Sequence, residues 1–300
     1  MDVKKRKKRK NAIKHMDAAM ICVFFVFLLY AFSLVFPFLF MIVNSFKDAG
    51  EFFKGSIWGL PSSLTFDNYS YAFLNLPVQA NIFGHNMQFN MLHMFIVSIA
   101  ITISSMIVNS LAAGASAYVI AKFKFRGKDL IYGLIIVMMT VPIVGNLPAK
   151  YRMMSAVGLI DNPVGLLLLY ANGAGMPFLI LYGFFKNMAS GYAEAAYLDG
   201  ASEVKVFFKI MLPIAMPALT SVSILFAIGV WNDYTTASIF MRKIPTLSVG
   251  LNIMLIDLRH RSAYPQSFAA MTIALLPILL VFIGFQKIIM KNTIAGGLKG

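Results

Sequence analysis

The sequence has few charged residues and almost no cysteine. The first shortage limits the class of protein, and the second limits the kinds of site that the chain can form. Charged residues make up 13% of its 300 positions and hydrophobic residues 59%, whereas an ordinary soluble domain is roughly 25% charged. Water is therefore not the main solvent, and the composition predicts an integral membrane protein. A single cysteine, Cys22, excludes disulfides and multi-cysteine metal sites within one chain, so cysteine usage indicates no redox compartment.

Two further absences concern the energy source of any membrane activity. No G-x-x-x-x-G-K-[ST] phosphate-binding loop is present, because the nearest match, Gly127-Lys128-Asp129, lacks the hydroxyl residue. Ionisable side chains are nearly absent from the middle of the apolar runs; Asp233 lies near the end of one, and no histidine is central. Carriers coupled to protons or ions usually need buried relay groups, so this pattern argues against such a mechanism.

Six apolar segments approach the roughly 20 residues needed to cross a hydrocarbon core. They are residues 18–43, 91–121, 130–148, 163–185, 213–235 and 267–290. The first is far longer than the apolar region of a signal peptide, so we interpret it as a retained span. Pro142, Gly145 and Pro148 interrupt the third, where we expect a kink or an early unwinding. Small residues at 112–117 favour close helix packing, and the predicted fold is an all-α bundle.

Basic residues are distributed unevenly between the two sides that six crossings define. With the N-terminus inside, eight lie before the first span, four in 122–128, three in 186–209 and three after Phe285. That arrangement places 18 of the 26 basic residues inside. Because Lys and Arg stay preferentially on the cytoplasmic side, both termini are predicted to be cytoplasmic. The net charge of +14 thus indicates topology and not nucleic acid binding.

A charged stretch, EAAYLDGASEVKVFFKIMLP at 194–213, separates the fourth and fifth apolar runs. It starts with good helix formers, with Glu194 in the first turn, and Gly200 is expected to end that helix in the left-handed conformation. Ser202 is expected to cap a second helix, after which Pro213 opens the fifth span. The second helix carries an apolar stripe at helical spacing, formed by Val204, Phe207, Phe208, Met211 and Leu212.

This charged stretch has two interpretations. A helix lying on the membrane surface would explain the apolar stripe of the second piece. It would not explain the first piece, because the face of Ala195 and Ala196 beside Glu194 is too small to anchor in lipid. That small face suits a surface pressed into the groove of another protein. Two rigid pieces joined at a glycine form a shape that a partner can hold and push.

Seven positions of this stretch resemble, with every spacing kept, the EAA motif of permease subunits of bacterial ABC importers. They are Glu194, Ala195, Ala196, Gly200, Ile210, Leu212 and Pro213. LTFDNY at 64–69, WNDY at 231–234 and FQKIIMKNTIAGGLKG at 285–300 resemble the carbohydrate branch of that family, the relatives of the smaller maltose-type permease subunit. The resemblance runs from the first span to the last residue, although the basic leader is longer than is usual in the family.

The resemblance implies a type I ABC importer permease bundle of six transmembrane helices with a cytoplasmic coupling helix. The implied parts are a basic cytoplasmic leader at 1–15, a first transmembrane helix at 16–44, an extracytoplasmic loop at 45–88, a type-1 transmembrane core at 89–290 and a cytoplasmic tail at 291–300. Within the core lie the coupling loop at 190–213 and an outer loop at 236–266. The loop after the first span and the outer loop are alternatively solvated connectors.

The resemblance also implies a function, that of the permease subunit of an ATP-driven, binding-protein-dependent importer of sugars or oligosaccharides in the bacterial plasma membrane. The chain itself would be non-catalytic and would hold no cofactor or metal, because ATP and Mg would bind partner ATPase subunits. The implied partners are a second homologous permease, two ATP-binding subunits, an extracytoplasmic solute-binding protein, the carbohydrate and membrane lipid, with no nucleic acid.

Other functions remain open at this point. The chain is alternatively an ABC importer permease for a solute that is not a sugar. A self-sufficient secondary carrier or channel would favour intramembrane charge and internal repeats, which are not evident. A membrane anchor or sensor would need a soluble output domain, and no stretch is long enough to form one.

The family resemblance assigns roles to particular residues. The residues expected to couple to the ATPase are Glu194, Ala195, Ala196, Leu198, Asp199 and Gly200. Those expected to contact the ATPase from the tail, unless the tail is a frayed end, are Gly296, Gly297 and Lys299. Those expected to contact the binding protein are Arg242, Lys243, Arg259 and Arg261. Those that either line the substrate path or brace the helix end are Trp231, Asn232, Asp233 and Tyr234.

Overall fold

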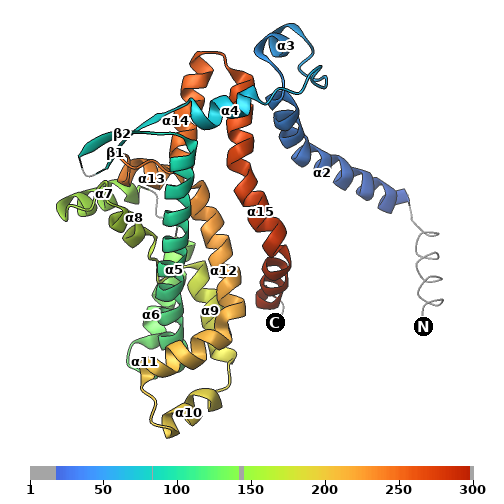
Figure 1. The fold of residues 1–300 in the computed structure, drawn as a ribbon. Helices are drawn as coiled ribbons and strands as arrows, with labels where there is room; N and C mark the ends of the chain where they lie inside the picture. The colour runs from blue at the N-terminus through green and yellow to red at the C-terminus, as the bar shows by residue number, and fades with distance from the viewer. Residues whose placement is uncertain (1–17, 83, 142–144, 298–300) are drawn as a thin grey trace.

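The structure is a computed structural model that describes residues 18–82, 84–141 and 145–297. This part of the chain is a helical bundle with short helices at both ends (Figure 1). The predicted leader at 1–15 and the predicted tail residue Lys299 lie outside the described residues. The helices are α2 (Ala18–Ser45), α3 (Ala49–Lys54), α4 (Asp67–Leu74), α5 (Met91–Lys122), α6 (Lys128–Thr140), α7 (Asn146–Ala156), α8 (Pro163–Tyr170), α9 (Met176–Asn187), α10 (Gly191–Leu198), α11 (Glu203–Val206), the π-helix η1 (Phe207–Met211), α12 (Leu212–Asn232), α13 (Tyr234–Phe240), α14 (Leu247–His260) and α15 (Tyr264–Gly297). A hairpin is formed by β1 (Val78–Ile82) and β2 (His85–Phe89).

Four helical stretches of the described residues are long and apolar enough to cross a membrane. They are Met20–Ser45, Met91–Lys122, Glu203–Asn232 and Tyr264–Lys287. These stretches correspond to the first, second, fifth and sixth apolar segments of the sequence. The chain is therefore a multi-pass membrane protein, as its composition predicts.

The third and fourth apolar segments form shorter helices. In the third, α6 ends at Thr140 and α7 begins directly after Gly145, which has a φ of 85°, so the expected early unwinding is present. The fourth, expected as one helix over 163–185, is split into α8 and α9 by the non-helical residues 171–175. That expectation was wrong, because Gly175 adopts a φ of 122° and α5 provides partners for the carbonyl groups freed at the break.

The fifth span does not begin at Pro213, as the sequence suggested. Instead α11, η1 and α12 form one continuous helix through the proline. Proline has no N–H, and its ring crowds the carbonyl group four residues earlier in an α-helix. Directly before the proline the helix widens into a π turn, in which the N–H of Leu212 bonds to the carbonyl oxygen of Phe207, five residues back.

The π turn also changes which residues of this helix are buried. Val206, Phe207 and Met211 are buried, whereas Val204 is 66% exposed and Phe208 is 50% exposed. The predicted apolar stripe therefore has two exposed members, Val204 and Phe208, and its other members face the bundle. A stripe drawn at regular α-helical spacing loses its register when one turn is widened by an extra residue.

Two separate hydrophobic cores lie at the two ends of the bundle. At one end α5, α9, α10, η1 and α12 enclose a core centred on Tyr118, whose ring lies 5.1 Å from that of Phe207 and 5.5 Å from that of Phe185. At the other end α4, the hairpin, α14 and α15 pack around the start of α5. A side chain at Gly250 of α14 would collide with the Met94 side chain of α5, which would have to move to make room for it.

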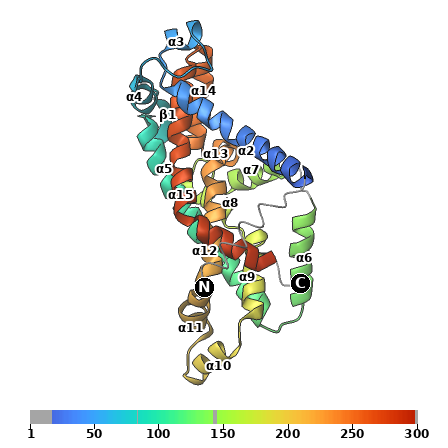
Figure 2. The same cartoon turned by 90° about the vertical axis from the view of Figure 1, so that its right-hand side faces the viewer.

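The segment at 45–88, which the sequence left open as a solvated connector, contains α3, α4 and the hairpin. These elements lie at the end of the bundle opposite α10 (Figures 1 and 2). Figure 2 shows α2 crossing obliquely over the upper part of the bundle, while α10 and α11 project from the other end. The arrangement leaves most side chains of α2 exposed.

Candidate functional site

The charged stretch of the sequence forms a tip that projects from one end of the bundle (Figure 1). Gly200 ends α10 with a φ of 75°, which confirms the predicted left-handed terminator. Its N–H donates to the carbonyl oxygen of Tyr197 at 3.0 Å, and the N–H of Ala201 donates to that of Ala196 at 2.9 Å. This pair of hydrogen bonds is a Schellman motif, which satisfies two carbonyl groups at the helix end. Ser202 occupies the N-cap position of α11 as expected, although its side chain forms no capping hydrogen bond.

A side-chain hydrogen bond closes the joint around Gly200. The Tyr197 hydroxyl donates to Oε2 of Glu203 at 2.7 Å, so it links α10 to α11. Burial, followed by this hydrogen bond to Glu203, raises the pKa of Tyr197 above its ordinary value. The hydroxyl therefore keeps its proton throughout the physiological pH range, and the link does not depend on pH there.

The predicted coupling residues divide into an exposed and a buried set. Leu198 is 90% exposed at the end of α10, and Glu194, Ala195, Asp199 and Gly200 are also exposed. Ala196 is buried in the core of the chain itself, beside η1. The small face formed by Ala195 and Ala196 is therefore not free as a unit, because Ala196 already packs inside this chain. Leu198 provides a larger exposed apolar contact.

The tip is connected to the bundle through aromatic and polar contacts. Phe207 of η1 packs against Tyr118 of α5, which in turn contacts Phe185 of α9. Nζ of Lys122 donates to the carbonyl oxygen of Met188 at 2.5 Å, which ties the end of α5 to the start of the loop. These contacts link the tip to α5 and to the shorter helix α9.

Polar side chains of α5 bind the break between α8 and α9. Nδ2 of Asn109 donates to the carbonyl oxygens of Tyr170 at 3.0 Å and Asn172 at 3.3 Å, and the Ser116 hydroxyl donates to that of Gly173 at 2.8 Å. The sequence analysis did not identify Asn109, which is an isolated amide within an apolar run. Polar side chains at such positions commonly satisfy backbone groups freed in a neighbouring helix.

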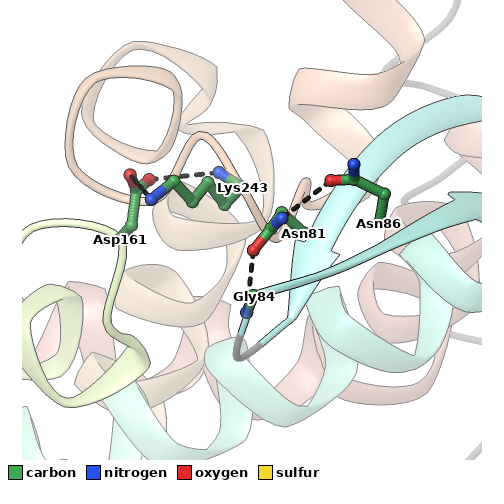
Figure 3. A network of polar contacts seen from close by, with 5 residues as sticks. All are labelled: Asn81, Gly84, Asn86, Asp161 and Lys243. Atoms are coloured by element: carbon green, nitrogen blue, oxygen red, sulfur yellow. Dashed lines mark hydrogen bonds and ion pairs between the residues drawn. The ribbon is translucent and has the colours of Figure 1, made fainter.

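At the opposite end of the bundle, one polar network joins three loops (Figure 3). Asp161 has a φ of 58°, accepts a hydrogen bond from the N–H of Lys243 at 3.1 Å and pairs with its Nζ at 3.6 Å. The carbonyl oxygen of Lys243 accepts from the N–H of Asn81 in β1 at 2.7 Å. The hairpin turn is held by Asn81, whose Oδ1 accepts from the N–H of Gly84 and whose Nδ2 donates to Asn86. Lys243 is thus part of a structural junction.

The other predicted docking cations are Arg242, next to Lys243 in sequence, and Arg259 and Arg261 at the end of α14. Arg242, Arg259 and Arg261 are exposed, and Arg261 pairs with Asp257 at 3.1 Å. Two exposed cations that the sequence analysis did not select, Lys150 and Arg152, flank Tyr151 of α7.

The Tyr151 ring lies 6.1 Å from that of Phe240, two residues before Arg242. This contact brings the two cations of α7 to the same region as Arg242 and Lys243. Within the described residues, Lys150, Arg152 and Arg242 take part in no ion pair.

The WNDY residues have separate environments. Trp231 packs on Phe95 at 5.9 Å and borders a wholly apolar cavity of about 240 Å³ between α5, α12 and α15. Asp233 caps α13 by accepting from the N–H of Thr236 at 2.9 Å, and it accepts from the Tyr170 hydroxyl at 3.1 Å. These two residues therefore have bracing contacts. Asn232 and Tyr234 are exposed.

The remaining predictions concern the C-terminal tail and metal binding. Gly296 and Gly297 belong to the last turn of α15. Among the residues that the structure describes, no cluster of three or more His, Cys, Asp or Glu side chains is placed to hold a metal ion.

Comparisons with known proteins agree on membrane components of transport systems. The family described as "Binding-protein-dependent transport system inner membrane component" matches residues 110–294. The chain is 30% identical over 264 residues to the "Diacetylchitobiose uptake system permease protein NgcG" of Streptomyces coelicolor, covering 87% of this chain and 82% of the relative. It is 27% identical over 278 residues to the "Arabinooligosaccharides transport system permease protein AraQ" of Halalkalibacterium halodurans, covering 90% and 93%.

A solved structure shares the fold. Its description is "Crystal structure of a bacterial ABC transporter involved in the import of the acidic polysaccharide alginate". The match has a TM-score of 0.74 at 21% sequence identity and covers 91% of this chain and 98% of that chain. The likeness therefore extends over nearly the whole of both chains.

Proposed function

The chain belongs to the family of binding-protein-dependent transport system inner membrane components, and on this premise we propose that it is the permease subunit of an ATP-driven importer of sugars or oligosaccharides. The match confirms the family that the EAA-like spacing suggested. Support for a carbohydrate comes from the relatives, whose names specify diacetylchitobiose and arabinooligosaccharides.

The proposed topology has six crossings with both termini in the cytoplasm. Four are the long apolar helices, and the other two are made by α6 and by the interrupted pair α8 and α9. The hydrogen bonds from Asn109 and Ser116 support a membrane position for the break, because they satisfy carbonyl groups that lipid cannot. The distribution of basic residues supports the orientation. The proposed parts keep the predicted limits, with a leader at 1–15 and a transmembrane core at 89–290.

The observation that carries the proposal is the projecting tip formed by α10 and α11. It is locked internally by the Schellman motif and by the bond from Tyr197 to Glu203, yet it presents Leu198 at 90% exposure. A rigid tip with an exposed apolar residue suits a groove in a partner. We assign that partner as an ATPase subunit, which would bind ATP and Mg, since this sequence has no phosphate-binding loop.

The outer end is proposed to receive a solute-binding protein. Arg242, Arg259 and Arg261 are available on its surface, and Lys150 and Arg152 extend the basic region around the junction of Asp161 and Lys243. Exposed cations of this kind steer an acidic partner and fix its orientation. Lys243 contributes mainly by holding the loop in place.

For the substrate path, the contacts of Trp231 and Asp233 favour bracing over sugar binding. Asn232 and Tyr234 are exposed and remain the WNDY residues proposed to meet the sugar. A second, homologous permease would complete the path. Gly296 and Gly297, with Lys299, are proposed to reach the ATPase from the end of α15.

The test uses Leu198, because a substitution at a side chain that is 90% exposed leaves the packing of the bundle intact. Leu198→Asp should reduce copurification of the ATPase by about tenfold or more, since loss of a central apolar contact typically costs at least ~1.4 kcal/mol. Uptake of diacetylchitobiose or arabinooligosaccharides into proteoliposomes should fall with it. Leu198→Met is the matched control and should preserve both. Normal uptake with no ATPase bound would refute the coupling role.

A further inference from the structure

We propose that residues 56–65 form a lobe that inserts into the membrane interface beside the end of α2 and contacts lipid. The proposal does not depend on the transported solute or on any partner. It concerns part of the loop that the sequence left open as a solvated connector. Its evidence is the closure of the lobe, the direction in which it folds and the character of its exposed side chains.

The two ends of the lobe are tied to two adjacent residues, Lys47 and Phe46, which directly follow α2. Nζ of the fully buried Lys47 donates to the carbonyl oxygen of Ser56 at 2.9 Å. The N–H of Thr65 donates to the carbonyl oxygen of Phe46 at 3.0 Å. The residues between these attachments therefore form a closed loop that is fixed at its base. A buried ammonium group is costly unless it is hydrogen-bonded, so Lys47 strongly favours this closure.

The lobe folds back along α2 and not away from it. The ring of Trp58 lies 5.9 Å from that of Phe36 and 5.2 Å from that of Phe40, both on the apolar helix α2. Phe40 is six residues before Phe46, which corresponds to about 9 Å along a helix. Trp58 is thus held at the depth of the membrane-spanning segment. The ring of Phe40 also lies 5.8 Å from that of Phe268, one turn inside α15, so a second span reaches the same level.

The large exposed side chains of the lobe are apolar, and its exposed polar side chains are serines. Trp58 is 70% exposed and Leu60 is 81% exposed, and Leu64 is exposed as well. No charged residue occurs between Gly55 and Phe66. Tryptophan is enriched where the hydrocarbon region meets the polar headgroups, because its ring is apolar and its N–H is polar. Such a stretch is unfavourable in water but suits the boundary between headgroups and acyl chains.

Lipid is the occupant that these observations favour over a protein partner. The lobe continues the apolar surface of α2 through the stacked rings of Trp58, Phe36 and Phe40. It offers no charged group with which a protein would be selected. A second permease on this surface is the competing occupant, and the experiment below distinguishes the two.

The test places a nitroxide spin label on the full chain in phosphatidylcholine vesicles. In a Cys22→Ser background, single labels are placed by Leu60→Cys in the lobe, Leu29→Cys in the middle of α2 and Gln88→Cys on the exposed polar strand β2. Collisions with oxygen, which concentrates in lipid, are compared with collisions with a water-soluble nickel chelate. The label at 60 should collide more with oxygen and less with nickel than the label at 88, with values between those of the labels at 88 and 29, as expected at the boundary between headgroups and acyl chains. A response like that of the label at 88 would overturn the proposal.

The same labels are then measured in the complete importer, with partner chains that lack cysteine. Retained oxygen collisions at position 60 support contact with lipid, whereas loss of both kinds of collision would show that a protein covers the lobe and would overturn the proposal. Trp58→Ser in the labelled chain should increase nickel collisions at position 60, and Trp58→Phe should not. An unchanged response in Trp58→Ser would contradict the role of the ring in directing the lobe.

Discussion

The break between α8 and α9 and the continuous helix through Pro213 form an instructive pair. Both stretches lie in apolar segments and both contain residues that disfavour a regular α-helix. The first loses its helical structure over residues 171–175, whereas the second stays helical from Glu203 to Asn232. Local sequence alone would have ranked them the other way, because proline disrupts a helix more strongly than glycine does.

The difference lies in where the displaced carbonyl groups find partners. At the break, Asn109 and Ser116 of α5 satisfy three carbonyl oxygens from outside the segment. At Pro213 the helix continues without a break, and in the widened turn before the proline the N–H of Leu212 bonds to the carbonyl oxygen of Phe207 within the same helix. The break between α8 and α9 therefore occurs where a neighbouring helix replaces the lost hydrogen bonds.

The largest expected effect comes from removing the outside partner. Asn109→Leu should destabilise the chain by about 2 kcal/mol, because the carbonyl oxygen of Asn172 loses the Asn109 amide and that of Tyr170 keeps only the N–H of Asn172. The free energy of unfolding in mixed micelles measures it. Asn232→Leu is the control, since that amide is exposed and bonds to a carbonyl oxygen of its own helix. Equal effects at the two positions would contradict the explanation of the break.

A third joint, Gly200, extends the comparison to the projecting tip. Gly200→Val should cost roughly 1–2 kcal/mol, because a side chain in the left-handed conformation is strained although no atom lies in its way. Gly191→Ala, also in open space but without a positive φ, should cost far less. ATPase copurification and sugar uptake, measured together with stability, should decline only in the Gly200 variant. Uptake unchanged in both variants would show that the bend is not needed.

A smaller effect is expected from closing the space at the break. Gly173→Ala should cost about 1 kcal/mol, because an added Cβ would lie 2.9 Å from the Ser116 hydroxyl and displace the donor that binds this carbonyl group. Gly183→Ala in α9, where no atom lies within 4 Å, is the matched control. Thermal unfolding in detergent measures both variants, and a cost confined to the control would reverse the interpretation.

The smallest effect is expected at Pro213. A proline inside a regular α-helix costs about 3 kcal/mol. If Pro213 strained its helix to this extent, Pro213→Ala would stabilise the chain by the same amount. Since the π turn already accommodates the proline, the free energy of unfolding should change by less than about 0.5 kcal/mol. A gain approaching the full cost would show that the widened turn does not relieve the conflict.

The sequence by itself determined the features that depend on local residue type. Long apolar runs predicted the four complete spans because crossing lipid requires about 20 apolar residues. Gly200 was predicted as a helix terminator because only glycine adopts the left-handed conformation freely. The spacing of the EAA-like loop indicated the family that the comparisons confirm. The roles of the coupling, docking and sugar-facing residues remain predictions.

The tertiary structure alone decided the features that depend on distant partners. The break at 171–175 requires Asn109 and Ser116, which lie more than fifty residues earlier in the chain. The burial of Lys47 depends on a loop that returns to the end of α2, and the burial of Ala196 depends on η1. Hydrophobic periodicity reports which side chains avoid water, but it does not identify the distant groups that satisfy a freed carbonyl or a buried charge.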